Sequence, residues 1–255
     1  MDFKVKGHSD SSISIRSNND KNVVFKESTN IRLRKSIKKH QDFSSNFFKT
    51  PIIHDVSPEP NNAYTMEYIN GYSFFEFLNL CSKKDLDDFI LKLSGYFNET
   101  IHETIKIPTN ILINKLNSIG YYNDYYYIFG GTDYLEVYTG NCHGDMTLSN
   151  MIFKDDDVYL IDFLDSYIES PTMDLIKLRQ DTHLHWSFNM IDVKKSDLMK
   201  SKIALKYIDE WITDTYDMRN YKILQIINLV RIFPYTSDIK IKNFIHEKIK
   251  LIWNE

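Results

Sequence analysis

Four side chains in the middle of the chain have the types and the spacing that phosphoryl transfer requires. His143, Asp145 and Asn150 lie in one polar stretch, and Asp162 comes directly after the apolar run 158–161. Transfer of a phosphoryl group needs a carboxylate near the acceptor hydroxyl, oxygen ligands for Mg²⁺ and cations for the phosphates. Asp145 is placed as the carboxylate that accepts the proton of the hydroxyl.

Asn150 and Asp162 are placed to share one metal ion. An amide oxygen and a carboxylate are hard ligands suited to Mg²⁺, which usually keeps some waters and shares substrate phosphates. We predict that residues 151–153 and 158–161 pair as a short hairpin around the turn 154–157. Such a hairpin would bring Asn150 and Asp162 close together.

Other chemistry is weaker in this stretch. Cys142 beside His143 resembles half of a nucleophile–base pair, but adjacent residues of an extended chain point to opposite faces. We therefore interpret His143 as a hydrogen-bonded structural residue. The carboxylates of the turn, Asp155, Asp156 and Asp157, are interpreted as solvated.

The elements that must position these residues change in kind along the chain. Apolar alternation predicts strands over 2–6, 13–15, 22–26, 51–56 and 63–69, with one helix over 30–43. Helical spacing then predicts helices over 72–80, 83–106, 111–119, from about 173, and over 196–217, 219–232 and 238–253. The shift places a lobe boundary near Asn70–Gly71, which gives an N-terminal lobe over 1–70 and a helical lobe over 71–255.

Composition excludes several classes of partner. The chain has 255 residues, a net charge of −4 and two cysteines, with a pI of about 6.1. No overall basic field would hold it on nucleic acid or an anionic membrane, and the two cysteines fit a reducing compartment. Without a signal-like or membrane-spanning run, we expect a cytoplasmic protein. One basic run is interpreted as a solvated helix face: Arg32, Arg34, Lys35, Lys38 and Lys39.

The motif residues resemble a known signature. His143-Gly144-Asp145, then Asn150, then Ile161-Asp162-Phe163 resembles that of the aminoglycoside phosphotransferase and choline kinase superfamily, the small-molecule branch of the protein-kinase-like fold. Residues 66–71 (MEYING) resemble its hinge, 24–26 (VFK) its phosphate-binding strand and 174–175 (DL) its acidic helix start. The resemblance implies an α+β, two-lobed fold: a five-stranded antiparallel N-terminal sheet with one helix, and a larger helical lobe with a short catalytic β-hairpin.

The resemblance also implies residue roles. Asp145 becomes the catalytic base, Asn150 and Asp162 the metal ligands, and Lys26 the phosphate lysine. Glu67 and Tyr68 become backbone contacts to the adenine, and His143 and Asp174 structural supports.

Two departures from the family pattern concern the phosphates. The loop that is normally glycine-rich has a single glycine, Gly7, so Ser9 and Ser11 would have to bind phosphate. Residues 30–43 contain no glutamate to pair with Lys26. Both departures put the phosphate clamp in doubt more than the fold.

The acceptor is expected to be a small molecule. Only 11 residues separate Asp162 from Asp174, too few for the activation segment with which a protein kinase binds its peptide. Acidic and aromatic side chains beyond this point are candidates for holding a cation or a set of sugar hydroxyls: Asp165, Tyr167, His183, His185 and Trp186. For Trp186, packing in the helical core is an equal alternative.

We therefore expect an ATP- or GTP-dependent, Mg²⁺-dependent kinase for a hydroxyl of a small polar metabolite: a sugar, a choline-like amino alcohol or an aminoglycoside. A place in cell-surface glycan metabolism is one expectation. The alternative is a nucleotide-binding pseudokinase that acts as a regulatory or scaffold module, and a protein kinase is the third possibility. The sequence leaves the oligomeric state open.

Overall fold

The first part of the chain forms an antiparallel sheet with one helix. The computed structural model describes residues 3–5, 11–18, 21–30, 32–58, 62–189 and 195–254. The strand order in the sheet is β1-β2-β3-β5-β4. The strands are β1 (Phe3–Val5), β2 (Ser11–Asn18), β3 (Lys21–Ser28), β4 (Ile53–Val56) and β5 (Ala63–Glu67).

Helix α1 (Arg32–Asp42) packs on this sheet through a small apolar cluster. Leu33 and Ile37, one helical turn apart, bury themselves against Tyr64 and Met66 of β5. The opposite face of α1 carries lysines and arginines, as the basic run predicted. The helix is therefore held to its sheet by only a few buried side chains.

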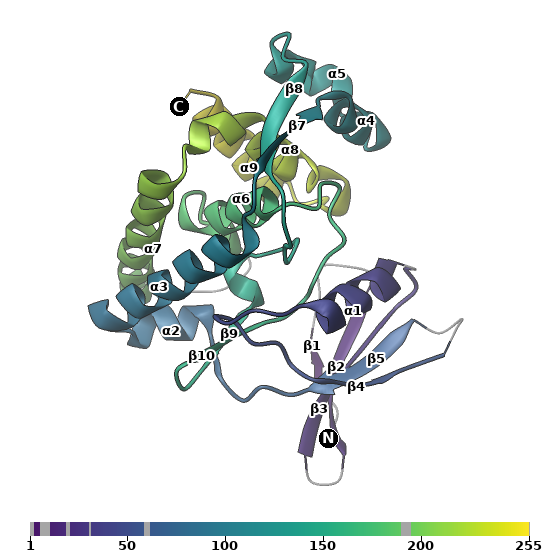
Figure 1. Cartoon of the computed structure of the whole chain (residues 1–255), viewed down its shortest axis with the longest axis vertical. Helices are drawn as coiled ribbons and strands as arrows, with labels where there is room; N and C mark the ends of the chain where they lie inside the picture. The colour runs from purple at the N-terminus through teal and green to yellow at the C-terminus, as the bar shows by residue number, and fades with distance from the viewer. Residues whose placement is uncertain are drawn as a thin grey trace.

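The rest of the chain is mainly helical and contains the larger core. Figure 1 shows the sheet and α1 at one end of the molecule and the helices at the other, with the β9–β10 hairpin between them. The longer helices are α2 (Phe74–Leu80), α3 (Lys83–Thr100), α4 (Asn110–Ser118), α6 (Pro171–Thr182), α7 (Lys195–Thr215), α8 (Lys222–Val230) and α9 (Ile239–Asn254). The short helical turns are α5 (Tyr122–Tyr125), η1 (Tyr126–Phe129), η2 (Leu148–Asn150), η3 (Trp186–Asn189), η4 (Met218–Tyr221) and η5 (Phe233–Tyr235).

One predicted helix was wrong over its last residues. The helix expected over 83–106 ends at Thr100, and β7 (Thr104–Pro108) follows it and pairs with β8 (Tyr134–Tyr138). The sequence Thr-Ile-Lys-Ile-Pro alternates with a period of two and is β-branched at three positions, which favours a strand. Its partner is about 30 residues away, so local spacing alone did not reveal the pairing.

The other predicted elements agree in type, with shifted ends. The sheet of the larger part contains β6 (Tyr72–Ser73), β9 (Met151–Lys154) and β10 (Asp157–Leu160) in the order β10-β9-β6. Ser73 caps α2 through a capping box with Glu76. Across the described ranges, no helix combines the length and the apolar character that a membrane crossing requires.

Candidate active site

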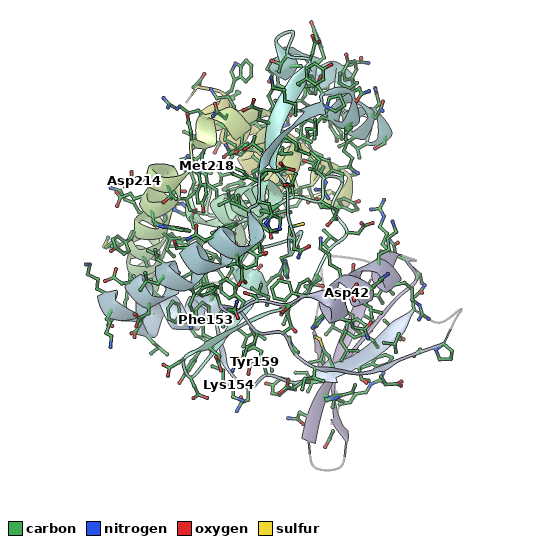
Figure 2. The ribbon with its side chains drawn as sticks, in the orientation of Figure 1. Asp42, Phe153, Lys154, Tyr159, Asp214 and Met218 are labelled. Atoms are coloured by element: carbon green, nitrogen blue, oxygen red, sulfur yellow. The ribbon has the colours of Figure 1, made fainter. Side chains whose placement is uncertain are left out.

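The predicted hairpin is present and joins the two candidate metal ligands. Strands β9 and β10 are antiparallel, with Leu160 opposite Met151. Beyond this pair, the Ile161 N–H donates to the Asn150 carbonyl at 3.0 Å. Figure 2 shows Phe153, Lys154 and Tyr159 on this hairpin, between the two parts of the molecule. The residue after Ile161, Asp162, has a φ of 65°, so the chain turns sharply where its carboxylate leaves the strand.

Asp145 is fixed by two neighbours. The Lys177 ammonium lies 2.9 Å from Asp145 Oδ1, and Asn150 Nδ2 donates to the Asp145 carbonyl at 2.8 Å and to Asp145 Oδ2 at 3.2 Å. Burial alone would raise the pKa of Asp145, but the Lys177 ammonium outweighs it and leaves this pKa below the usual value. The carboxylate is therefore ionised at neutral pH. Because the Asn150 amide nitrogen donates both of these hydrogen bonds to Asp145, the amide oxygen of Asn150 points away from that residue.

His143 is fully buried and structural, as predicted. Its Nδ1 accepts the Asp145 N–H at 3.2 Å, which leaves Nε2 to donate to the Ile161 carbonyl at 2.9 Å. Only the neutral tautomer with hydrogen on Nε2 satisfies both contacts. Burial lowers the pKa of His143 to about 4. The ring thus ties the loop of Asp145 to the strand end before Asp162.

Asp174 braces the same loop from α6. Its carboxylate accepts the His143 N–H at 2.6 Å, the Gly144 N–H at 2.7 Å and the Tyr96 hydroxyl at 2.8 Å. Burial raises its pKa to about 6 despite these donors. Gly144 has a φ of 88°, and a Cβ there would lie 2.1 Å from the Leu164 carbonyl oxygen. The glycine of the motif is therefore required by conformation and by space.

A second buried carboxylate holds the far end of the loop. Asp181 accepts the Leu148 N–H at 2.7 Å, and the Ser187 N–H and hydroxyl at 3.0 and 2.7 Å. Burial raises the pKa of Asp181 to about 6. Its three donors make Asp181 a scaffold residue of the loop.

Lys26 reaches the site and pairs with Asp162. The lysine is buried at 7% exposure in β3, and the carboxylate of Asp162 is accessible. In agreement with the sequence, no glutamate of α1 is available as a partner. The ion pair joins the two candidate residues for phosphate and metal directly, across the boundary between the sheet and the helical part.

Helix α1 contributes lysines to the site in place of a glutamate. The Lys39 ammonium pairs with Glu169, donates to the Leu164 carbonyl at 3.0 Å, and lies 3.4 Å from Cys142 Sγ. One turn earlier, Lys35 pairs with Asp165 at 3.2 Å. The basic face of α1, interpreted as solvated, is therefore in part a docking face for the loop after Asp162.

The structure describes only some of the other residues that were predicted to bind the nucleotide. Ser9 and Gly7 lie outside the described residues, and Ser11 opens β2 opposite Ser28 of β3. The Glu67 N–H donates to the Ile52 carbonyl at 2.8 Å. Tyr68 follows the end of β5 and lies outside the strands. The Glu67 N–H is thus already used within the sheet.

Of the five candidate acceptor residues, three lie elsewhere. Trp186 is buried at 8% exposure and packs against Phe244 of α9, which is the core alternative. His183 faces Asp209 of α7, with 3.3 Å between Nδ1 and Oδ2. His185 packs near Phe188. His185 also borders a small pocket with Leu148 and Asp181.

Asp165 and Tyr167 do lie on the loop after Asp162. Asp165 is compensated by Lys35, and the guanidinium of Arg231 lies over the Tyr167 ring, 4.6 Å from its centroid. Burial raises the pKa of Tyr167 to about 12. The aromatic group expected to face a cation therefore already has a cation of the protein on its ring.

Sequence reasoning missed Lys177, Arg231, Tyr96 and the role of Asp181. Lys177 had a usable signal, because it follows Asp174 by three residues on one helix and so shares its face. Asp181 has the same signal, because it follows Lys177 by four residues on α6. Tyr96 of α3 and Arg231, which follows α8, are distant in sequence and have no local pattern.

Cys142 is not an activated nucleophile. Burial raises the pKa of its thiol well above the usual range, so the thiol stays protonated at neutral pH. Its Sγ lies 3.3 Å from Glu169 Oε2. Cysteine catalysis, already disfavoured by the sequence, has no support here.

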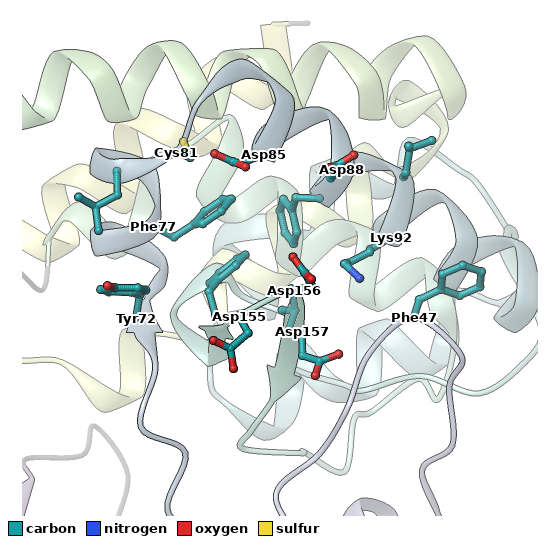
Figure 3. Close-up of a pocket in the computed structure, with 15 residues that line it drawn as sticks. Phe47, Tyr72, Phe77, Cys81, Asp85, Asp88, Lys92, Asp155, Asp156 and Asp157 are labelled. Carbon is teal, nitrogen blue, oxygen red and sulfur yellow. The ribbon is translucent and has the colours of Figure 1, made fainter.

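A cavity of about 680 Å³ lies apart from these residues. Figure 3 shows Phe77 and the carboxylates of Asp85, Asp88 and Asp156 around it, between α2, α3 and the β9–β10 turn. Its lining does not include Asp145, Asn150 or Asp162. Asn150 and Asp162 lie instead at the end of the hairpin away from its turn. The volume of a cavity therefore does not by itself identify the site.

The fold is a two-lobed, kinase-like fold, and Lys26, Asp145, Asn150 and Asp162 lie between its two parts. No family model matches the chain, and no curated protein matches it. Among solved structures, it is similar to a thermostable mutant of aminoglycoside phosphotransferase APH(4)-Ia, with a TM-score of 0.63 and 8% identity over 99% of this chain and 93% of that chain. A choline/ethanolamine kinase family protein from Mesorhizobium loti gives a TM-score of 0.54 and 12% identity over 100% and 87%.

A further structure of the same phosphotransferase was determined in a ternary complex with ADP and hygromycin B, and it is similar with a TM-score of 0.63 and 8% identity over 99% and 92%. At these identities the likeness establishes the fold. It confirms, at that level, the resemblance drawn from the motif residues.

Proposed function

We propose that this protein is an ATP- and Mg²⁺-dependent kinase that phosphorylates a hydroxyl of a small polar metabolite. The observation that carries the proposal is the position of Asp145, an ionised carboxylate hydrogen-bonded to Asn150 and joined through the hairpin to Asp162. Sugars, including those of cell-surface glycans, and amino alcohols fall within this class.

Asp145 acts as the base in this proposal. Its low pKa keeps it ionised, and Lys177 and Asn150 fix its orientation. The carboxylate orients the acceptor hydroxyl and accepts its proton as the oxygen attacks the γ-phosphorus. His143 and Asp174 act only by holding the loop.

Asn150 and Asp162 fit a magnesium ion. The Asn150 amide oxygen is turned away from Asp145, and the Asp162 side chain is 45% exposed. An amide oxygen and a carboxylate suit an ion that completes its shell with waters and phosphate oxygens. When bound, Mg²⁺ would neutralise charge on the transferred phosphoryl group.

We assign nucleotide binding to residues 1–70 and the acceptor to residues 71–255. Lys26 binds phosphate oxygens, and the backbone at Glu67 to Asn70 meets the adenine. Ser9 and Ser11 remain the candidates for further phosphate contacts. The complexes of a similar structure with ADP and of another with AMP-PNP support a nucleoside triphosphate, with ATP proposed ahead of GTP.

The test is phosphate transfer from ATP to a panel of small hydroxyl compounds. Because general-base catalysis contributes about 10²- to 10⁴-fold, Asp145→Asn should lower kcat by that range. Mg²⁺–ATP should still raise the melting temperature of the variant. The matched control is Asp156→Asn, in the exposed turn between β9 and β10, which should retain full activity. An Asp145→Asn enzyme as active as the wild type would refute the proposal.

A pseudokinase remains the second candidate, because α1 offers lysines where a glutamate would pair with Lys26. It predicts thermal stabilisation by Mg²⁺–ATP without phosphate transfer to any fraction of a metabolite extract. The same two measurements therefore separate the candidates.

A further inference from the structure

The carboxylates near Asp145 are already compensated by lysines. Asp145 itself is paired with Lys177 at 2.9 Å. On the loop after Asp162, Asp165 is paired with Lys35 at 3.2 Å, and Glu169 is paired with Lys39. A cationic acceptor would have to displace one of these lysines.

Two cations on the same side of the loop lack a carboxylate partner. For the part of the chain that the structure describes, no ion pair joins Arg231 or Lys115 to an acid. Arg231 covers the Tyr167 ring at 4.6 Å. Lys115 is half-buried on α4. Its pKa is lowered, first by burial and then by the positive charges of Arg231 and Arg32. The charged groups that shift the pKa of Lys115 are thus both cations.

The fold brings Arg231 to Tyr167 and places α4, which bears Lys115, against α8. Arg231 follows α8 directly, with its N–H bonded to the Ile227 carbonyl at 3.0 Å, and α4 contacts α8. Tyr167, beneath Arg231, lies five residues after Asp162. Arg231 is also one of the charges that lower the pKa of Asp145.

We propose that the acceptor carries an anionic group, a carboxylate or a phosphate, that binds between Arg231 and Lys115 while its hydroxyl meets Asp145. This inference rests on the proposed kinase function and names its substrate class. Two neighbouring cations that are partly removed from water and have no carboxylate in ion-pair contact repel one another, and an anion relieves that cost. The planar guanidinium of Arg231 matches a carboxylate or phosphate with two parallel hydrogen bonds.

The inference separates this site from the acceptors expected from sequence. A choline-like or aminoglycoside cation would meet Arg231 over Tyr167, with Asp165 already bound to Lys35. Like charges in such a site oppose binding. A sugar acid or a sugar phosphate has both the hydroxyl and the anion.

The experiment divides a small-molecule extract of the source organism by ion exchange. After charcoal has removed nucleotides, the anionic, neutral and cationic fractions are each offered as acceptors with γ-³²P-labelled ATP and the wild-type protein. Labelled product formed by Asp145→Asn is subtracted as background. We expect the label to enter the anionic fraction. Prior treatment of that fraction with phosphatase should abolish labelling if the anion is a phosphate, and leave it unchanged if the anion is a carboxylate.

Variants then test the two cations. Because a lost hydrogen bond to a charged group costs about 1.5–3 kcal/mol, Arg231→Gln and Lys115→Met should each raise the KM for the anionic acceptor roughly ten- to hundredfold. Arg231→Lys, which keeps the charge, should recover part of the loss. The control is Lys106→Met, an exposed lysine of β7, which should leave the KM unchanged.

The outcomes are distinct. Label in the neutral or cationic fraction alone would overturn this inference while supporting the kinase function, as would Arg231→Gln with the wild-type KM for an anionic acceptor. No label in any fraction would overturn both.

Discussion

The loop that carries Asp145 and the helix α1 are held in different ways. The loop is fixed by backbone N–H groups that donate to the buried carboxylates of Asp174 and Asp181. Helix α1 is fixed by four buried apolar residues and by ion pairs from Lys35 and Lys39. The catalytic loop thus belongs to the rigid core of the helical part, whereas α1 depends on charges at a partly exposed boundary.

The largest expected effect is on the loop. Asp174→Leu leaves the N–H groups of His143 and Gly144 and the Tyr96 hydroxyl buried without an acceptor. Because each such group costs about 1–3 kcal/mol, the free energy of unfolding should fall by roughly 3–5 kcal/mol in urea titrations. Tyr96→Phe, which removes only one of the donors, should cost about 1 kcal/mol. Similar losses of unfolding free energy in the two variants would contradict the conclusion that Asp174 holds the loop.

A smaller effect is expected at α1. Lys39→Met removes the partner of Glu169 and a donor to the Leu164 carbonyl, which should lower stability by about 1 kcal/mol after allowing for the half-exposed glutamate. Because α1 then loses its tie to the loop after Asp162, the KM for ATP should rise. The double variant Lys39→Glu/Glu169→Lys should recover part of the affinity.

The control on the same helix is Lys35→Met. Lys35 is 72% exposed in its pair with Asp165, so its removal should change stability by less than about 0.5 kcal/mol. Equal effects of Lys39→Met and Lys35→Met on the KM for ATP would show that the pair with Glu169 is only a surface contact.

A separate prediction concerns pH. The pKa of His143 is lowered to about 4 in the fold, against about 6.5 in the unfolded chain. The unfolded state therefore binds more protons between these values, so the stabilising contribution is complete above pH 6.5 and is lost as the pH falls toward 4. Nitrogen-15 NMR should show the neutral ring with hydrogen on Nε2 at pH 5.5. A ring protonated at that pH would refute the assigned tautomer.

Most of the proposed catalytic centre has local signals in the sequence. Asp145 and Asn150 are five residues apart, and the alternation on either side of the turn 154–157 predicted the hairpin that joins Asn150 to Asp162. Lys26 became a candidate through the resemblance of residues 24–26 to the phosphate-binding strand of the family. The acceptor residues were harder to predict: Trp186 and His183 have suitable chemistry, but the chain turns them into the helical part.

The sequence by itself determined which residues could transfer a phosphoryl group, because that chemistry depends on residue type and on spacing within a loop and a hairpin. Only the tertiary structure decided how charges are paired. Lys26 meets Asp162 across 136 residues of chain, and Lys39 meets Glu169 across 130. A lysine on a basic helix face can bind solvent or a distant carboxylate, and no local pattern distinguishes the two. The charge left over after that pairing, on Arg231 and Lys115, is therefore a property of the fold.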